Sequence, residues 1–242
     1  MTYRPIIIVP FYNHLSCFKQ TAKHYADTRY PILLVNDGSS FKETKGVKTL
    51  AKQYHFPYLE LKQNSGKGAA VITGIKWAIE HNYTHALQID SDGQHNYRDI
   101  SKFFTLSKKN SHCIINGIPL YDHSVPKSRL YGRKITNFWV CIETGTSQIK
   151  DVMCGLKVYP LNEMKFVLPL LKFKRMGFDI EIIVKSYLNG INIVNCPTKV
   201  IYPPNGISHF KATRDNCEIF LTHTTLCLYS FYKRLFSWRK HV

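Results

Sequence analysis

Two aspartates, Asp90 and Asp92, follow a short apolar run and are separated by one serine. Side chains alternate along an extended chain, so the two carboxylates point to the same side. Such carboxylates repel each other unless a positive charge lies between them, and a divalent cation with oxygen ligands fits that place. Gln94 adds a neutral oxygen at the next position of the same parity. The alternative is a solvated turn, since an Asp-x-Asp triplet is short and common.

The chain before these aspartates predicts the elements that position them. Buried strands of a parallel sheet are expected over four short apolar runs: Ile6–Val9, Ile32–Val35, Tyr58–Leu61 and Ala86–Ile89. Apolar residues at helical spacing occupy each interval between these runs. This alternation is typical of βαβ units, so we expect an α/β fold with a parallel sheet flanked by helices.

Polar clusters follow each of these strands: Tyr12-Asn13, Asn36-Asp37, Asn64–Gly68 and Asp90–His95. Ligands of open parallel sheets bind beyond the carboxyl ends of the strands. We therefore expect the four clusters to converge on one binding site. Lys67 stands between two glycines at a predicted helix start, where it either meets a phosphate or sugar oxygen or is simply solvated.

The rest of the chain predicts a mixture of strands and helices. In chain order these are strand Cys113–Asn116, loop Gly117–Ser128, helix Arg129–Ile149, strand Leu156–Tyr159, helix Asn162–Lys174, helix Ile182–Leu188, strands Ile191–Asn195 and Lys199–Tyr202 around Pro197, and helix Asp215–Val242. The basic helix from Arg129 has one apolar side, which either packs on the core or lies at an interface. The basic, aromatic-rich tail favours a membrane-surface element over a helix packed on the body.

The 242-residue chain carries a net charge of +17, which favours an anionic partner such as nucleic acid, an acidic membrane or a phosphorylated ligand. We expect one body over residues 1–212 and a helical tail over residues 213–242. The seven cysteines are scattered without a C-x-x-C pair, which predicts reduced thiols in a cytoplasmic protein and no zinc site. Neither a signal peptide nor a transmembrane helix is predicted.

With these motifs assembled, the chain resembles the family 2 glycosyltransferases, and most closely their polyprenyl-phosphate (dolichyl-phosphate) mannosyltransferase-like branch. The matching segments are IIIVPFYN at 6–13, LLVNDGSS at 33–40, NSGKGAA at 64–70, LQIDSDGQH at 87–95, DVMCGLKVY at 151–159, GFDIEI at 177–182 and GISHF at 206–210. Their order and spacing make the combined match specific. The resemblance implies the GT-A fold, a Rossmann-like and mostly parallel sheet flanked by helices, with an amphipathic C-terminal helix.

The resemblance also implies a role for each matching residue. The nucleotide-sugar donor would be bound by Pro10, Tyr12, Asn13, Val35, Asp37, Asn64, Lys67, Asp90 and Ser91. A Mg²⁺ or Mn²⁺ cofactor would be held by Asp92, Gln94 and Asp90. The catalytic residues would be Asp92 and, beside the acceptor, Asp179, with Glu181 in reserve. A loop with Ser208, His209 and Lys211 would close over the phosphates, although the branch usually has Ser-Lys where this chain has Ser208-His209. The arginine that the branch carries shortly after the Cys113–Asn116 strand is missing here, and Arg129 or Arg133 would supply that charge on the acceptor side instead.

This layout predicts an inverting, metal-dependent transfer of a sugar from a UDP- or GDP-sugar to a lipid-linked or glycolipid acceptor. A phosphate acceptor is already anionic, whereas a hydroxyl acceptor needs a carboxylate to take its proton. The protein would be peripheral on the inner, cytoplasmic face of the cell membrane, with the anionic membrane surface as a partner. The alternatives are a soluble glycan or protein acceptor, and a basic nucleic-acid-binding module without activity, although no nucleic-acid-binding motif is present and no nucleic acid is expected.

Overall fold

The structure, a computed structural model, describes residues 2–121, 125–201 and 211–238. The described strands form a seven-stranded sheet of order β3-β2-β1-β4-β6-β5-β7. They are β1 Pro5–Phe11, β2 Ile32–Asn36, β3 Tyr58–Glu60, β4 His85–Gln88, β5 Ile114–Tyr121, β6 Lys157–Pro160 and β7 Ile193–Val200. The helices are α1 Leu15–Ala26, α2 Phe41–Gln53, α3 Lys67–Glu80, α4 Ile100–Lys109, α5 Lys127–Thr144, α6 Leu161–Val167, α7 Phe178–Leu188 and α8 Ala212–Trp238, with short 3-10 helices η1 Tyr97–Asp99 and η2 Leu168–Leu170.

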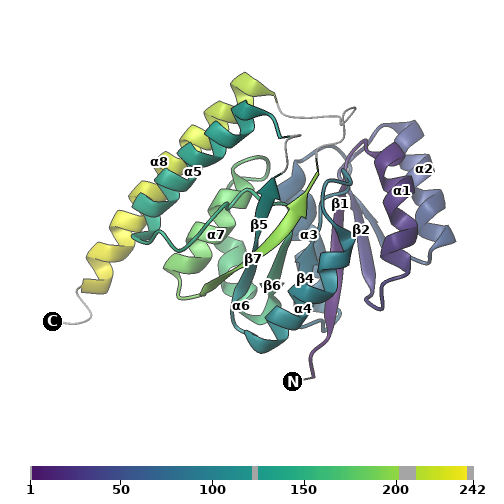
Figure 1. The fold of residues 1–242 in the computed structure, drawn as a ribbon, viewed down its shortest axis with the longest axis horizontal. Coiled ribbons are helices and arrows are strands. Elements are labelled where there is room, and N and C mark those ends of the chain that lie inside the picture. Colours follow the sequence, from purple (N-terminus) through teal and green to yellow (C-terminus); the bar gives the residue numbers. More distant parts are fainter. Residues whose placement is uncertain (1, 122–124, 202–210, 239–242) are drawn as a thin grey trace.

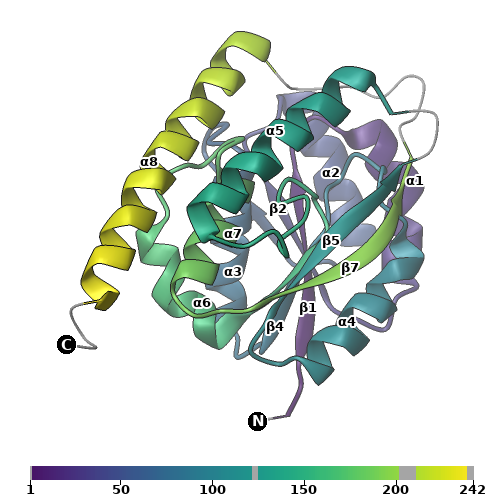
Figure 2. The same ribbon diagram turned by 60° about the vertical axis from the view of Figure 1, so that its left-hand side comes forward.

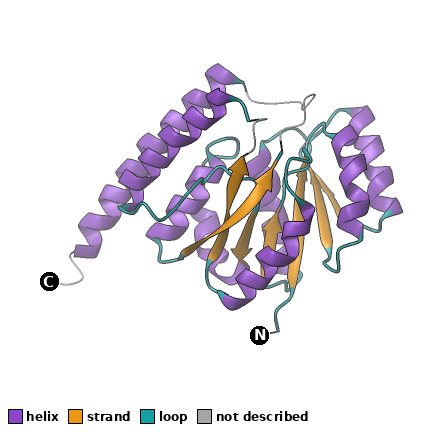
Figure 3. Cartoon of the chain, viewed as in Figure 1, coloured by secondary structure: helices purple, strands orange, loops and turns teal. Residues whose placement is uncertain are grey.

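Helices cover both faces of the sheet (Figures 1 and 3). Within β1, Ile6 and Ile8 belong to the core that α3, α6 and α7 cover, whereas Ile7 and Val9 belong to the core under α1, α2 and α4. Because both sides of the strand are buried, β1 is an unbroken apolar run instead of an alternating one. The predicted α/β architecture is therefore confirmed.

The first four strands run in one direction and place their following loops at one edge of the sheet. The pairs β1–β2, β1–β4 and β2–β3 are all parallel, and β5–β7 is parallel as well. Among the described strands, β6 alone runs against its neighbours. The loops that follow Phe11, Asn36, Glu60 and Gln88 therefore leave the sheet at the same edge, as predicted from the chain order.

Two predictions about strands near prolines are wrong. β5 continues to Tyr121, so the first part of the expected loop Gly117–Ser128 is strand. β7 is a single strand and not two strands around Pro197. Both prolines are tolerated because β7 is an edge strand of the described sheet, and because β6 pairs with only the first part of β5, before Pro119.

The later helices also differ from their predicted bounds. The helix expected over Asn162–Lys174 ends at Val167, just ahead of the 3-10 turn that contains Pro169. α5 ends at Thr144, because Gly145 adopts a φ of +74° that closes the helix. α8 packs against α5 and α7 (Figure 2). The division of the chain into a body and a tail at residue 212 stays a prediction.

Membrane crossing can be judged for the described helices. Among residues 2–121, 125–201 and 211–238, no helix combines the length and the apolar character needed to span a bilayer.

Candidate active site

The Asp37 carboxylate ties the turn after β2 to the loop before α3. It accepts hydrogen bonds from the backbone N–H groups of Ser65 (2.7 Å) and Gly66 (2.9 Å) and from the amide of Asn64 (3.0 Å). Burial raises the pKa of this carboxyl, and the two backbone N–H groups oppose the rise. Asn13 joins the loop after β1 to the same turn by a 3.0 Å hydrogen bond. Hydrogen bonds therefore link three of the predicted clusters at this edge of the sheet, which we call the donor edge.

Arg175, in the loop before α7, also binds this edge, through Asn64. Its guanidinium donates to the side-chain oxygen of Asn64 at 2.6 Å and to the Asn64 backbone carbonyl at 2.9 Å. Gly66 lies against the same segment with a φ of +101°, and a Cβ there would be 2.3 Å from the carbonyl oxygen of Lys174. The loop before α7 thus fixes the position of the loop before α3.

Three charged side chains, Lys67, Lys157 and Asp179, meet beside this edge. Asp179 lies in the first turn of α7 and is only 4% exposed. Its carboxylate contacts Lys67 Nζ at 2.6 Å and Lys157 Nζ at 3.0 Å. Burial would raise the pKa of Asp179, but the two ammonium groups outweigh burial and hold that pKa below its usual value. Asp179 is therefore an ionised partner of two lysines.

Lys67 connects Asp179 to the acidic turn after β4. Its ammonium lies 3.2 Å from the carboxylate of Asp90. Burial would lower the pKa of Lys67, but the two carboxylates outweigh burial and raise it. Asp90 occupies space that Gly155 leaves open, since a Cβ on Gly155 would lie 2.0 Å from an Asp90 carboxylate oxygen. The glycine of the matching segment DVMCGLKVY is thus required by the position of Asp90.

Asp92 and His95 complete the acidic turn. The Asp92 carboxylate accepts a 3.0 Å hydrogen bond from the backbone N–H of Gln94. Burial and the charge of Asp90 both raise the pKa of Asp92. Burial also lowers the pKa of His95, in spite of the opposing charges of the two aspartates. Within the described part of the chain, His95 Nδ1 is buried without a hydrogen-bond partner.

The chemistry of this turn suits a divalent cation that a substrate helps to hold. Among the described residues, no three His, Cys, Asp or Glu side chains converge as a complete metal site would require. Mg²⁺ is commonly bound by one or two carboxylates together with substrate phosphates, so a complete protein cage is not needed. Burial raises the pKa of Asp92, and the negative charge of Asp90 raises it further. A cation between the two carboxylates would offset both effects.

The remaining donor-side residues that were predicted lie near this edge at different depths. Pro10 and Val35 are buried, and the Val35 side chain packs towards α3 beside Gly74, so it supports the edge from below. Tyr12 is half-buried in the loop after β1, and Ser91 is 3% exposed. The structure therefore gathers the polar members of the predicted set and leaves Val35 in the core.

Arg133 is the predicted acceptor-side residue that the structure brings to the site. It forms an ion pair with Asp151, which also accepts a 3.2 Å hydrogen bond from the Tyr121 hydroxyl. Its positive charge also acts on His95 and helps to lower the pKa of that residue, after the larger effect of burial. Arg133, on the inner side of α5, is therefore near enough for its charge to act on the acidic turn.

Two other predicted acceptor-side residues, Arg129 and Lys211, lie before and after Arg133 in the chain. Arg129 is half-buried in the first turn of α5, and Lys211 is exposed just before α8. The Lys211 N–H donates a 2.7 Å hydrogen bond to the side chain of Asp215. Ser208 and His209 lie outside the described residues.

Glu181, which was expected to stand in reserve as a base, lies in a dense set of polar contacts. Its carboxylate is fully buried and accepts hydrogen bonds from the N–H groups of Lys172 and Phe173, both at 2.8 Å. It also pairs with Lys185 at 2.6 Å. The two backbone contacts hold the loop before α7, and the Lys185 pair lies within α7. A catalytic role for Glu181 stays a prediction.

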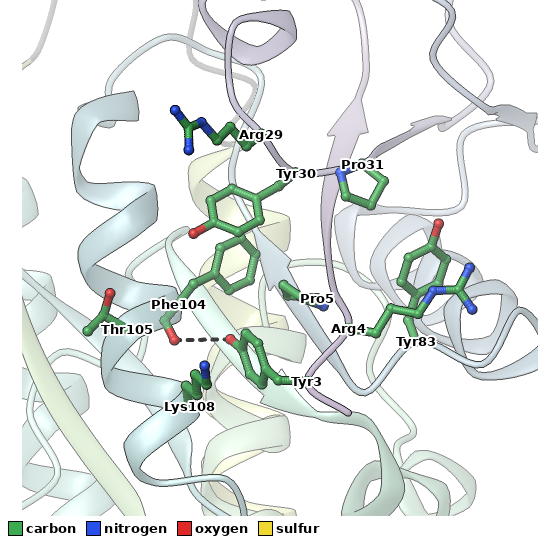
Figure 4. Close-up of a pocket in the computed structure, with 10 residues that line it drawn as sticks. All are labelled: Tyr3, Arg4, Pro5, Arg29, Tyr30, Pro31, Tyr83, Phe104, Thr105 and Lys108. Carbon is green, nitrogen blue, oxygen red and sulfur yellow. Dashed lines mark hydrogen bonds between the residues drawn. The ribbon is translucent and has the colours of Figure 1, made fainter. Parts of the chain in front are cut away.

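A surface hollow of about 620 Å³ lies away from this site (Figure 4). It is lined by Tyr3, Pro5, Tyr30, Pro31, Tyr83 and Phe104, among others. Phe104 belongs to α4, and the other five stand at the amino ends of β1, β2 and β4, opposite the carboxyl ends that carry the acidic turn. The Tyr3 hydroxyl donates to the Phe104 carbonyl at 3.0 Å across it. None of the predicted site residues lines this hollow.

Residues 6–155 match the protein family described as "Glycosyl transferase family 2". This chain belongs to that family. The match covers more than half of the 242 residues and includes the edge built by Asp37, Asn64 and Lys67 and the Asp90–Asp92 turn. The protein is thus a glycosyltransferase of family 2, and this membership favours the enzyme over the nucleic-acid-binding alternative.

Named relatives and solved structures agree with this assignment. The UDP-N-acetylglucosamine–dolichyl-phosphate N-acetylglucosaminyltransferase of Methanococcus voltae is 27% identical over 213 residues, which cover 81% of this chain and 85% of the relative. The polyprenol monophosphomannose synthase of Mycolicibacterium smegmatis is 24% identical over 88% of this chain and 83% of its own length. A crystal structure of glucosyl-3-phosphoglycerate synthase from Mycobacterium tuberculosis with Mn²⁺ and UDP-glucose superposes with a TM-score of 0.65 at 12% identity, over 92% of this chain and 79% of that one. The last likeness confirms the GT-A fold.

Three residues of the site of this family 2 glycosyltransferase were not singled out from the sequence. Lys157 stands in an apolar strand, where only the position of Asp179 reveals its role. Arg175 belongs to a basic run just before the segment GFDIEI, and that position was a usable signal. The sequence marks His95 as the end of the acidic motif without indicating a role, and only the fold shows that its Nδ1 is buried without a hydrogen-bond partner among the described residues.

Proposed function

We propose that this glycosyltransferase moves a sugar from a nucleotide-sugar, with inversion at the anomeric carbon and with a divalent metal, to a polyprenyl-phosphate lipid at the cytoplasmic face of the membrane. The choice of acceptor rests on the ionisation of Asp179: Lys67 and Lys157 keep its carboxylate ionised. A general base works best with a pKa near the working pH, and the pKa of Asp179 is displaced the other way. A phosphate acceptor needs no base.

The donor side of the proposal rests on the edge that Asp37, Asn64 and Arg175 build. Their hydrogen bonds fix the loop that carries Lys67, so the lysine stands at a defined place beside Asp90. Bound through Asp90 and Asp92, Mg²⁺ or Mn²⁺ would supply compensation for the negative charge of the leaving diphosphate. Lys67 adds a second positive charge on the same side, and donor phosphates would compete with Asp179 for it.

The acceptor side of the proposal rests on positive charge. Arg133 lies on the inner side of α5, and its charge acts on His95 of the acidic turn, while Lys157 is buried against Asp179. An anionic lipid phosphate would be attracted to this region, whereas a neutral hydroxyl would gain less from it. The names of the Methanococcus and Mycolicibacterium relatives, which contain dolichyl phosphate and polyprenol monophosphomannose, point to the same class of acceptor.

A panel of UDP- and GDP-sugars, with and without Mn²⁺, tests the donor half of the proposal. We expect one nucleotide-sugar to raise the melting temperature in the presence of Mn²⁺, and its sugar to be transferred into a membrane lipid extract. Binding stabilises a protein according to how far the ligand exceeds its dissociation constant, so a shift of the melting temperature reports the preferred donor. A panel that produces neither shift nor transfer contradicts the proposal.

Gly155→Ala is expected to reduce transfer by roughly a hundredfold, because the added methyl group would displace the Asp90 carboxylate from its position. The measurement is the transfer rate at saturating donor. Gly132→Ala is the matched control, since nothing lies within 4 Å of a Cβ at that helical position. That variant should keep full activity and gain about 0.5–1 kcal/mol of stability. Equal activity of the two variants would mean that the Asp90 position does not matter.

A further inference from the structure

The apolar side of α5 faces outwards. Tyr131, Ile135 and Phe138 are 65%, 61% and 62% exposed, and Trp139 and Ile142 continue the same stripe. The buried side of the helix contains Thr136, Glu143 and Thr144 together with Val140. A helix on the surface of a globular domain normally turns its apolar stripe to the core. α5 does the reverse, so packing on this core does not account for its stripe.

The C-terminal helix α8 repeats this arrangement. Its exposed apolar residues are Phe220, Leu221, Leu228, Phe231 and Leu235. Phe220 and Leu221 are adjacent, and the spacings of seven, three and four residues that follow keep all five along one side of a helix. Its buried residues include Asp215, Thr222, His223 and Ser230 beside Leu226. α8 therefore also buries polar groups and exposes apolar ones.

The two helices lie side by side and share a polar seam (Figures 1 and 2). His223 of α8 pairs with Glu143 of α5 at 2.7 Å, and Arg234 donates to the Ile142 carbonyl at 3.1 Å. Both helices also pack on α7, so their free sides face away from the body. We call the exposed apolar residues of both helices, from Tyr131 to Ile142 and from Phe220 to Leu235, the α5–α8 face.

Charge around the α5–α8 face has one sign. Lys127, Lys134 and Arg214 are exposed on these two helices. Of the described carboxylates on them, Glu143 and Asp215 are fully buried, and the third, Glu218, is half-buried and accepts a hydrogen bond from the Gly177 N–H. A broad apolar face with a cationic rim and, on the described residues of α5 and α8, no exposed carboxylate is complementary to a bilayer that contains anionic lipids. A protein partner would more commonly meet a rim of both signs.

We propose that the α5–α8 face docks the enzyme on the surface of an anionic phospholipid bilayer. Both helices start at the edge of the molecule towards which β5 and β7 point (Figure 1). The charge of Arg133, on the inner side of α5, acts on His95 of the acidic turn. Docking in this way brings the site to the level of lipid headgroups. That docking helps catalysis rests on the proposed function, because only transfer to a lipid acceptor benefits from a site at the membrane surface. Docking itself does not depend on transfer.

Flotation of the full-length protein with lipid vesicles tests the proposal. We expect the protein to float with vesicles of equal parts phosphatidylcholine and phosphatidylglycerol, and to bind vesicles of phosphatidylcholine alone more weakly. Phe138→Glu and Phe231→Glu should each weaken binding about tenfold, since each removes a large apolar side chain from the bilayer. Phe166→Glu is the matched control, because Phe166 is 75% exposed on α6, outside the α5–α8 face.

The outcomes separate docking from catalysis. A wild-type protein that does not float, or variants that float as well as Phe166→Glu, overturn the proposal. A protein that does not float but forms dimers by light scattering, with Phe138→Glu monomeric, shows a self-interface instead and also overturns it. Unchanged melting temperatures exclude unfolding as the cause of lost flotation. Transfer to a polyprenyl phosphate in detergent micelles, with no flotation, would leave the proposed function intact, and flotation without transfer would leave docking intact.

Discussion

Asp92→Ala is expected to lower transfer by about 10³-fold, the scale on which removal of one group that stabilises developing charge acts. The aspartate is half of the carboxylate pair that would hold the metal, so the variant should also lose the Mn²⁺-dependent part of donor binding. The measurements are the transfer rate and the donor-induced shift of the melting temperature, each with Mn²⁺ and with EDTA. Asp27→Ala, at the exposed end of α1, is the control and should behave like wild type.

The same variant is expected to be as stable as wild type or more stable. Burial and Asp90 raise the pKa of Asp92 in the folded protein, so the folded state binds this proton more tightly than the unfolded state. The ionised carboxylate therefore disfavours folding above the raised pKa, and its removal relieves that cost at neutral pH. Lost transfer together with an undiminished melting temperature would separate a functional defect from unfolding. Full activity of Asp92→Ala in EDTA would refute the role given to the pair.

Asp179→Asn is expected to lower the free energy of unfolding by about 3–5 kcal/mol, because it leaves the fully buried Lys157 ammonium without its counter-charge. Transfer should also fall, since Lys67 loses the partner that positions it. The measurement is urea denaturation with a transfer assay at the temperature where the variant stays folded. Glu60→Gln is the control: it breaks the exposed Glu60–Lys48 pair, and exposed pairs contribute about 0–1 kcal/mol.

The effect of Asp179→Asn on stability should depend on pH in a defined direction. Lys157 and Lys67 hold the pKa of Asp179 below its usual value in spite of burial. The ionised carboxylate therefore stabilises the fold above the pKa of the unfolded chain, and this contribution is lost as the pH falls through the lower, folded pKa. The difference in the free energy of unfolding between wild type and Asp179→Asn should therefore become smaller at acidic pH. A difference in the free energy of unfolding that does not change with pH would mean that the charge of Asp179, paired with the two lysines, does not stabilise the fold.

The convergence of the donor side could be predicted because it follows from strand order. Once β1, β2 and β4 were recognised as parallel, Asn13, Asp37 and Asp90 had to leave the sheet at one edge. The partners of Asp179 could not be predicted in the same way. Lys157 lies in a short apolar strand, where the sequence alone would predict an exposed lysine. Only the fold shows that it pairs with Asp179 in the first turn of α7.

The outward stripe of α5 shows a second limit of sequence patterns. The spacing of its apolar residues indicates that one side of the helix is distinct, but it does not say whether that side meets the core or the outside. In the structure, partners distant in the sequence determine which side faces inwards: His223 pairs with Glu143, and Ser230 donates to the Glu143 carbonyl. Those contacts draw the polar side of α5 inwards and leave Phe138 exposed.

The most direct test of the central claim compares two acceptors that differ only in the phosphate. The purified enzyme, its preferred nucleotide-sugar and Mn²⁺ are incubated in detergent with a polyprenyl phosphate or with the corresponding polyprenol, and sugar transfer to each lipid is measured. We expect transfer to the phosphate alone, and its loss in EDTA. Transfer to the free polyprenol at a comparable rate would contradict the claim, because it would require a base that the lysine-bound Asp179 does not provide.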